Sequence, residues 1–373
     1  MVVRDQSSPR ENPSVPTDLE KIYVRLLGRN HQQELFGSLV EYSQHAQGAI
    51  ASCPFHADSM PTLILYRDRP EYFCFVCGAR GDWLQYLQNT KSLNFSKALE
   101  ELSSASGIEI RDQQASIWRE NLERTQFLES AHTFFTTQLW SAPGRETLHA
   151  VFSRGYGMEE VEGMALGFYP GPNETRDYLL SQGCPRDDVD ALFSRVWISA
   201  AEAHRIVIPY RDSAGRLMGL MGMDISRRGS VAYAPITDMT PVLETPFLLY
   251  RCRGHEEVIV VEGFFDALLL DRIALKPVTG IGSDGLTTGH LETAAFFGIR
   301  HFILCLGNGP GKDRKTRDAI GRIRERGLEA SVMPLPGKFG DIDEFIRSTC
   351  LDHFKKLLTR IESDHEWLRA RNS

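Results

Sequence analysis

Three short, mostly apolar runs mark the C-terminal third of the chain as a region of buried strands. Val258–Val261 consists of four consecutive β-branched residues, and His301–Leu306 and Ala330–Leu335 are the other two runs. Such continuous runs are typical of strands that are covered on both faces in a parallel sheet. A helical pattern follows the first run, so we expect an α/β fold in which ligands bind at the carboxyl ends of the strands.

The rest of the chain mixes helical periodicity with short alternating runs. Helical patterns cover residues 17–42, 83–87 and 126–203, and Thr17 with Glu20 fits a capping box at the first of them. Alternating runs predict strands at residues 62–66 and 71–75. Residues 205–225 alternate around a turn at 212–215, which predicts a β-hairpin.

Composition describes a globular chain without a membrane span. Of the 373 residues, 42% are hydrophobic and 24% are charged, and the formal net charge is −7. A polyanion site must therefore come from local basic patches, because the whole chain does not attract nucleic acid. No apolar run reaches the roughly 18 residues of a membrane helix. The polar, proline-rich residues 1–16 lack the apolar core of a signal peptide, so we expect a disordered N-terminus and a cytoplasmic protein.

Four residues have the spacing of a zinc site. Cys53-x-x-His56 is followed by seventeen residues and then by Cys74-x-x-Cys77, which supplies three thiolates and one imidazole. This set fits a closed, tetrahedral, structural Zn²⁺ site, and the predicted strands between the pairs indicate a zinc ribbon. The remaining cysteines stand alone and are interpreted as buried thiols: Cys184, Cys252, Cys305 and Cys350.

Acidic residues follow two of the predicted strands. Glu262 ends the run 258–261, and Asp266 comes one helical turn later. Asp341 and Asp343 follow the run 330–335. Carboxylates that meet at strand ends suit Mg²⁺, a hard cation that prefers oxygen ligands. Capped helices with solvated acids would produce the same pattern, and the residues alone leave both interpretations open.

Basic residues concentrate in two stretches. Residues 204–254 contain seven arginines against four acids, and residues 300–327 contain eight lysines and arginines against three acids. A basic face there would follow a phosphate backbone, although a solvated surface would look alike. The candidate nucleic-acid contacts are Arg205, Arg211, Arg216, Arg227, Arg228, Arg251, Lys312 and Arg314.

Several motifs resemble those of the bacterial replicative (DnaG-type) DNA primases. CPFH at residue 53, CFVCGARGDWLQYL at residue 74 and NFSKALEEL at residue 94 are similar to that family's zinc-binding domain. VVEGFFDALLL at residue 260 is similar to the first motif of a Toprim domain, the α/β metal-binding fold of the primase core. Weaker similarities lie between these, and together they extend over about residues 17–362.

The resemblance implies a domain layout and an activity. We expect five segments after the N-terminus. They are a zinc-binding domain (17–102), a linker (103–125), the N-terminal part of the RNA polymerase core with the basic hairpin (126–255), a Toprim-like domain with closing helices (256–362) and a C-terminal tail (363–373). The activity implied is synthesis of short RNA primers from NTPs on a single-stranded DNA template by metal-dependent nucleotidyl transfer. Glu262, Asp266, Asp341 and Asp343 would be catalytic. Glu262, Asp341 and Asp343 would bind Mg²⁺ or Mn²⁺.

One departure from the family puts that activity in question. The family has an Asp-x-Asp pair after the strand 301–306, and this chain has Leu306 and Asn308 there. Leucine cannot bind a cation, and Asn308 offers at most a weak, neutral ligand. Three hypotheses follow: a primase, encoded by a phage or other mobile element and working with a replicative helicase in trans; a catalytically impaired, primase-derived single-strand-binding protein; and a Toprim nuclease.

Overall fold

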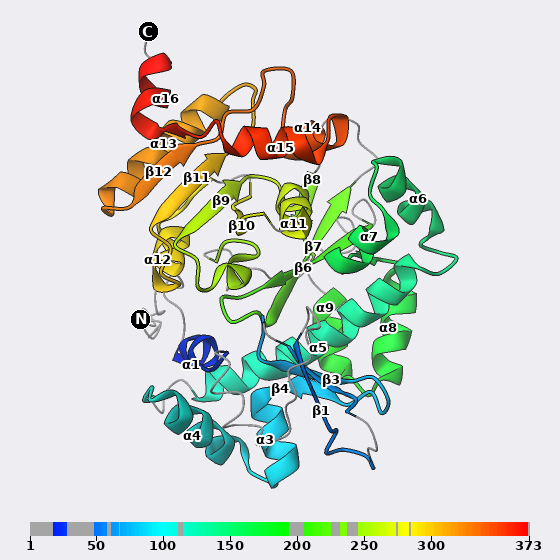
Figure 1. The fold of residues 1–373 in the computed structure, drawn as a ribbon. Helices are drawn as coiled ribbons and strands as arrows, with labels where there is room; N and C mark the ends of the chain where they lie inside the picture. The colour runs from blue at the N-terminus through cyan, green and yellow to red at the C-terminus, as the bar shows by residue number, and fades with distance from the viewer. Residues whose placement is uncertain are drawn as a thin grey trace, which may run out of the picture. The chain divides into compact units, whose positions relative to one another are not determined.

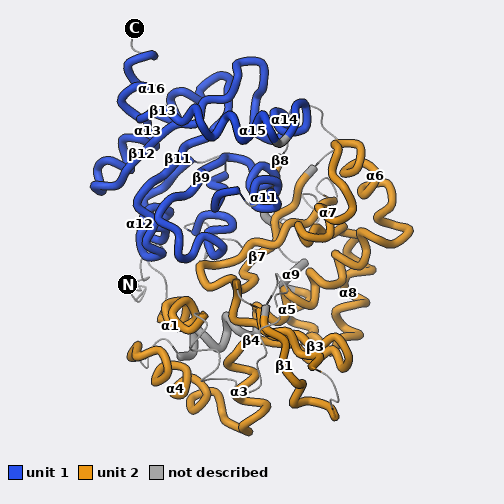
Figure 2. The backbone as a smooth tube through the Cα atoms, in the orientation of Figure 1, with its two compact units in different colours: residues 1–16, 240–373 blue, residues 17–239 orange. Residues whose placement is uncertain are grey.

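The computed structural model describes residues 18–27, 48–57, 61–66, 68–110, 115–193, 205–224, 232–236, 245–273, 275–282 and 285–371. The chain divides into two compact units, coloured in Figure 2. Unit 2 comprises residues 17–239, and unit 1 comprises residues 240–373 together with residues 1–16. None of the helices in the described ranges is long and apolar enough to cross a membrane.

Unit 2 begins with helix α1 (Asp18–Leu26) and a four-stranded antiparallel sheet (Figure 1). Its strands pair in chain order: β1 (Gly48–Ala51), β2 (Leu63–Tyr66), β3 (Glu71–Cys74) and β4 (Arg80–Asp82). Helices α3 (Trp83–Lys91) and α4 (Phe95–Ser106) follow. Buried and half-buried residues alternate in β2 and β3, so the predicted strands are confirmed. Thr17, the predicted cap of α1, lies outside the described residues.

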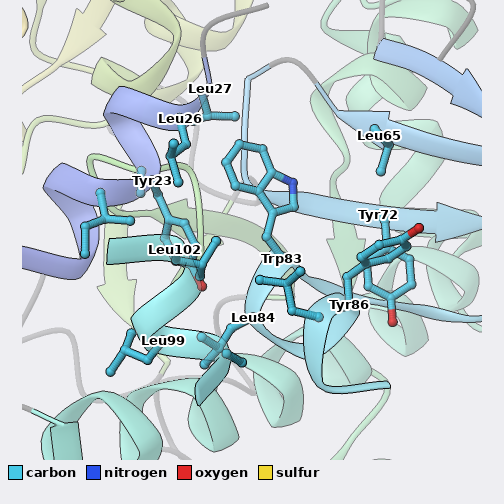
Figure 3. Packing of buried hydrophobic residues seen from close by; sticks show 14 of the residues in the cluster. Tyr23, Leu26, Leu27, Leu65, Tyr72, Trp83, Leu84, Tyr86, Leu99 and Leu102 are labelled. Atoms are coloured by element: carbon cyan, nitrogen blue, oxygen red, sulfur yellow. The ribbon is translucent and has the colours of Figure 1, made fainter. Parts of the chain in front are cut away.

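A single apolar cluster holds the small sheet and its helices together. Figure 3 shows Trp83 at its centre, with Tyr23 and Leu26 of α1 on one side. The rings of Tyr23 and Trp83 meet edge to face, with their centroids 5.9 Å apart. Asp82 lies beside this cluster. Its side chain accepts a hydrogen bond from the Tyr23 hydroxyl (2.8 Å) and caps α3.

The rest of unit 2 contains long helices and a second antiparallel sheet. The helices are α5 (Ala115–Leu139), α6 (Arg145–Ser153), α7 (Met158–Met164), α8 (Pro172–Ser181) and α9 (Arg186–Phe193). The sheet has the order β5 (Gly167–Phe168), β6 (Ile206–Arg211), β7 (Leu217–Asp224) and β8 (Ala232–Pro235). The β6–β7 pair confirms the predicted hairpin.

The segment predicted as a linker, residues 103–125, is largely helical. Helix α4 continues to Ser106, and α5 begins at Ala115. Residues such as Glu, Arg and Gln favour a helix even where few apolar side chains are present. That this segment links the ribbon to the core stays a prediction.

Unit 1 is built on a mainly parallel sheet of order β10–β9–β11–β12–β13. Its strands are β9 (Glu257–Val261), β10 (Val278–Gly280), β11 (His301–Cys305), β12 (Glu329–Val332) and β13 (Glu362–Ser363), and only β13 runs antiparallel. The helical segments are η3 (Leu249–Cys252), α11 (Phe264–Ile273), α12 (Thr288–Phe296), α13 (Lys312–Glu325), α14 (Ile342–Ser348), α15 (Leu351–Leu358) and α16 (Asp364–Ala370). The α/β fold predicted from the apolar runs is confirmed.

The sheet brings the acidic segments to one edge. Strand β11 lies between β9 and β12, and all three are parallel, so their carboxyl ends are neighbours.

The segment expected to be a tail, residues 363–373, instead contains α16, whose Trp367 is 2% exposed.

Candidate functional sites

The four predicted zinc ligands converge in the first sheet of unit 2. Cys53 follows β1, Cys74 ends β3, and His56 and Cys77 lie in the turns after them. Their ligand atoms all lie within 4.8 Å of one another, with 3.7 Å between the sulfurs of Cys53 and Cys77 and 3.9 Å between Cys74 Sγ and His56 Nδ1. Two antiparallel pairings bring the ligand pairs together: Leu63 of β2 lies opposite Ala51 at the end of β1 and opposite Cys74 at the end of β3.

The surroundings of Cys74 favour the thiolate, which is the form that binds metal. Desolvation raises the pKa of Cys74, but hydrogen bonds from the backbone N–H of Cys77 and the hydroxyl of Thr62 outweigh it and lower the pKa to about 6. Three thiols and one imidazole in a closed cluster fit a structural zinc ion. Cys53, His56, Cys74 and Cys77 therefore fit the zinc ion that their spacing predicted.

Arg211, a predicted nucleic-acid contact, is buried in an ion cluster instead. Its Nη1 donates to Glu129 Oε1 of α5 (2.8 Å) and to Glu71 Oε1 of β3 (3.1 Å), and Arg69 Nε donates to the other oxygen of Glu71 (2.7 Å). The side chain of Arg211 is only 9% exposed. Its interpretation as part of an exposed basic face was wrong, because its acidic partners lie far away in the sequence.

The two carboxyl groups of this cluster titrate differently. Burial and the charge of Glu129 raise the pKa of Glu71 to about 7, against the effect of Arg211 and Arg69. Desolvation opposes ionisation of Glu129 as well, but there Arg211 prevails and lowers the pKa. Burial and the neighbouring Glu129 thus outweigh both arginines at Glu71, so Glu71 takes up a proton before Glu129 does.

Arg216 is also buried, in the turn of the hairpin. Its guanidinium pairs with Asp212 Oδ2 at 2.7 Å, and both side chains are 3% exposed. Gly215 has a φ of +93°, and a Cβ there would lie 2.6 Å from Cβ of Arg69, so the turn needs glycine. The turn packs against the ribbon, where Ser213 donates to Glu20 Oε1 (3.0 Å). The prediction that Arg216 contacts nucleic acid from an exposed face was also wrong, here because a local partner, Asp212, buries its charge within the turn.

The other predicted contacts differ in exposure. Arg205 and Arg314 are exposed. Arg251 pairs with Asp271, and Lys312 pairs with Glu262. Arg227 and Arg228 lie outside the described residues. Of the eight predicted contacts, Arg205 and Arg314 are therefore the two that are exposed in the described part of the chain.

Glu262, the first predicted catalytic acid, lies at the carboxyl end of β9 between two lysines. Lys315 Nζ is 3.0 Å from Glu262 Oε1, and Lys312 Nζ contacts Oε2. Both lysines belong to the first turn of α13, three residues apart on one face of the helix. Lys312, a predicted phosphate contact, therefore pairs with Glu262 instead, and Lys315 is a second partner that the sequence did not single out. The i, i+3 spacing places both lysines on one helix face, but it does not show that this face meets Glu262.

Asp266 is buried beside the other two aspartates. Its oxygens accept backbone hydrogen bonds from Asp343 (3.1 Å) and Gly263 (3.2 Å). Burial, together with the charges of Asp341 and Asp343, raises the pKa of Asp266 to about 8. Mutual repulsion of this kind is typical of carboxylates that are gathered without a cation between them.

Asp341 and Asp343 have local partners as well. Asp341 caps α14 by accepting a hydrogen bond from the backbone of Glu344 (2.8 Å), and Asp343 Oδ1 accepts one from Arg347 Nε (2.9 Å). Within the described part of the chain, the ribbon cluster of Cys53, His56, Cys74 and Cys77 is the one group of three or more Cys, His, Asp or Glu residues whose ligand atoms lie close enough to share a metal ion. The three aspartates are neighbours, but their oxygens would have to turn towards a shared cation.

The segment after β11 carries no ligand in place of the missing acids. Leu306 is buried, at 5% exposure. The side-chain nitrogen of Asn308 donates to three carbonyl groups, those of Phe339 (2.9 Å), Leu335 (3.1 Å) and Pro336 (3.2 Å). Asn308 thus fastens the loop after β11 to the loop after β12, which is a structural role.

Residues 19–117 match the family model described as the CHC2 zinc finger of the DnaG zinc ribbon. The DNA primase of Pseudomonas putida is 26% identical over 360 residues, which cover 88% of this chain and 53% of that protein. The DNA primase of Escherichia coli K12 is 24% identical over 334 residues, covering 83% of this chain and 55% of the relative. Over most of its length, the chain is similar to bacterial DNA primases. It spans about half the length of these curated relatives.

Solved structures agree with the primase fold. The crystal structure of the Aquifex aeolicus primase, with its zinc-binding and RNA polymerase domains, matches with a TM-score of 0.60 and 20% identity, covering 94% of this chain and 87% of that one. A DnaG primase catalytic domain bound to single-stranded DNA matches 65% of this chain and 79% of its own length, with a TM-score of 0.53 and 18% identity. The predicted zinc ribbon followed by a primase core is confirmed.

Proposed function

We propose that this chain acts in primer synthesis, as a primase-type nucleotidyltransferase on single-stranded DNA. The observation that carries the proposal is the continuity of the similarity: ribbon, hairpin sheet and parallel sheet follow one another as in the primase from Aquifex aeolicus. In the reaction, the 3′-hydroxyl of one nucleotide attacks the α-phosphorus of a nucleoside triphosphate. A bond forms between the 3′-oxygen, which loses its proton, and the α-phosphorus. The bond between the α-phosphorus and the oxygen that bridges it to the β-phosphate breaks, and pyrophosphate leaves.

The template would be held by the ribbon and by exposed basic side chains. Phe75 and Val76, in the turn between Cys74 and Cys77, are 57% and 60% exposed. An exposed aromatic ring on a rigid turn offers a surface on which a base can stack. Arg205 and Arg314 are the predicted phosphate contacts that the structure leaves exposed. A replicative helicase in trans remains the expected protein partner.

The candidate catalytic acids fit a divalent cation only in part. Asp266, Asp341 and Asp343 offer oxygen donors close together, because the backbone N–H of Asp343 donates to Asp266 Oδ1 and Asp341 begins the same helix. These three residues would hold Mg²⁺ or Mn²⁺. When bound, the ion would supply positive charge to the transferring phosphate. Glu262 does not fit as a ligand in the same way, because both its oxygens face lysines.

Primer synthesis is tested directly with the full chain, labelled NTPs, a single-stranded template and Mg²⁺ or Mn²⁺. Template-dependent oligoribonucleotides are expected, and Asp341→Asn should reduce them at least tenfold, which corresponds to about 1.4 kcal/mol of barrier. The matched control is Asp352→Asn, an exposed aspartate on α15. Absence of product with either metal, under conditions in which a bacterial primase is active, would refute the proposal.

A second candidate function is single-strand binding without catalysis. The ion pairs of Glu262 and the replacement of the family's aspartates by Leu306 and Asn308 favour it. It predicts an affinity for single-stranded DNA that falls with salt, weakens on Phe75→Ala and does not change on Glu262→Gln. Template-dependent synthesis that is lost in Glu262→Gln would rule it out.

A further inference from the structure

The charge balance at the carboxyl end of β9 is unusual for an acidic strand tip. Glu262 presents one carboxylate, and two ammonium groups face it, one at each oxygen: Lys315 at Oε1 (3.0 Å) and Lys312 at Oε2. The three side chains are partly buried, with exposures of 22% for Glu262, 26% for Lys312 and 35% for Lys315. Such partial shielding makes the pairing stronger than that of a fully exposed pair.

The loop before α13 fixes where the lysines lie. It runs through three glycines with positive φ, at residues 307, 309 and 311. A Cβ at Gly307 would lie 2.3 Å from the carbonyl oxygen of Gly340, so the two loops are in close contact. Asn308 ties them further through its three carbonyl contacts. Because this loop is anchored at its start, the first turn of α13 is set over the end of β9.

We propose that Lys312 and Lys315 take the place of a divalent cation at Glu262. Two ammonium groups carry the same formal charge, +2, as a magnesium or manganese ion, and they already occupy both carboxylate oxygens. A divalent cation approaching Glu262 would have to displace them and would meet their repulsion. Any divalent cation in this unit is then bound by Asp266, Asp341 and Asp343, and Glu262 is not one of its ligands.

This inference concerns metal binding and does not depend on primer synthesis. Binding of Mn²⁺ to the full-length, zinc-loaded protein can be measured by electron paramagnetic resonance and by calorimetry. Lys312→Gln combined with Lys315→Gln frees Glu262, so this variant should bind Mn²⁺ at least tenfold more tightly than the unaltered chain. Adding Glu262→Gln to that pair should cancel the gain.

Two variants separate ligand chemistry from long-range charge. Arg314→Gln removes one positive charge from the same turn of α13, where no contact with Glu262 exists among the described interactions, and should change the affinity less than threefold. Glu262→Gln with Lys312→Gln removes one charge of each sign, so the net charge is kept. If Glu262 is no ligand, this balanced variant should bind Mn²⁺ within threefold of the unaltered chain.

Two results would overturn the inference. One is a tenfold or greater loss of Mn²⁺ affinity in the charge-balanced variant. The other is no gain in the double lysine variant while circular dichroism and urea unfolding show that it is folded. Should that variant not fold, Lys315→Gln alone and the charge-balanced variant decide the matter. A chain that makes primers can still fail this test, and one that makes none can still pass it.

Discussion

The two candidate metal sites of this chain differ in how their ligands are assembled. In the ribbon, two ligand pairs lie on turns, and the short antiparallel pairings β1–β2 and β2–β3 bring them together. In unit 1, the acids come from separate loops after β9 and β12, and each has a competing partner: lysines for Glu262, a helix end for Asp341 and Arg347 for Asp343. A site encoded by local spacing is therefore more robust than one that depends on tertiary neighbours.

The comparison also separates two uses of buried charge. Around the ribbon, Arg211 bridges two carboxylates from different elements and serves stability. At the sheet end, the lysines face the very group that the sequence marks as catalytic. Ion pairing thus stabilises the fold at Arg211, whereas at Glu262 it occupies the carboxylate oxygens that would otherwise bind a metal ion.

The largest expected effect is loss of the ribbon when a zinc ligand is removed. A structural zinc ion contributes about 10–16 kcal/mol in zinc-finger peptides. Cys74→Ser should therefore release the metal and expose Trp83, which is fully buried in the ribbon core. Zinc content and tryptophan fluorescence report both changes. Cys350→Ser, an exposed thiol in unit 1, is the control and should keep its zinc. Full zinc content in Cys74→Ser would contradict the assignment.

Next in size is the effect of Arg211→Ala. The substitution leaves Glu71 and Glu129 close together without their shared counter-charge, which should cost about 3–5 kcal/mol of unfolding free energy. Urea unfolding of unit 2 measures it. Arg205→Ala is the matched control, because Arg205 is exposed, and it should change stability by less than about 0.5 kcal/mol. Equal stability of the two variants would mean that the ion cluster does not hold the ribbon in place.

A smaller effect should depend on pH. The pKa of Glu71 is raised from 4.5 to about 7 in the folded chain, so the native state holds this proton more tightly than the unfolded chain does. Its contribution to stability is thus present below pH 4.5 and is lost as the pH rises to about 7. Relative to the wild type, Glu71→Gln should gain up to about 3 kcal/mol between pH 5 and pH 8.

Urea unfolding of both proteins at each pH, with zinc held constant, isolates this term, since zinc binding has its own pH dependence that cancels in the difference. A stability difference between Glu71→Gln and the wild type that stays constant from pH 5 to pH 8 would show that Glu71 remains ionised throughout, held by Arg211 and Arg69.

The smallest effect sharpens the assignment of Asn308. Loss of the Asn308 side-chain contacts with three carbonyl oxygens in Asn308→Ala should lower the stability of unit 1 by about 1 kcal/mol, because these part-buried or exposed carbonyl groups can bind water instead. Affinity for Mn²⁺ should stay the same. Asn308→Asp, which keeps the size but turns an oxygen towards the carbonyls, should be at least as unstable. Weaker Mn²⁺ binding without a loss of stability would make Asn308 a metal ligand after all.

Much of the fold follows from local patterns. The run 258–261 became β9, the alternating residues 205–225 became a hairpin, and the Cys and His spacing became a closed cluster. Each of these depends on residues that lie close together in the sequence or on short strand pairings. Patterns of this range can be read without knowing the tertiary structure.

Two of the failures arise from ion-pair partners that lie far apart in the sequence, whereas Arg216 is paired with Asp212 in its own turn. Counting arginines along residues 204–254 could not show that Arg211 meets Glu71 and Glu129, which are 140 and 82 residues away in the chain. The pairing of Glu262 with Lys312, 50 residues apart, is equally invisible to local inspection. Electrostatic partners in a folded chain are set by topology, whereas a sequence window reports only the sign of the charge.

The outer pairings of the sheet in unit 1 are short, and this has a consequence for self-association. On one side, β13 adds two antiparallel residues beside β12, and on the other Phe247 forms a bridge to Gly280 of β10. Unpaired amide and carbonyl groups on a strand edge invite another molecule to extend the sheet. A chain shortened to end before β13 would expose the rim of β12 and should associate with itself, forming oligomers that light scattering would detect as concentration rises.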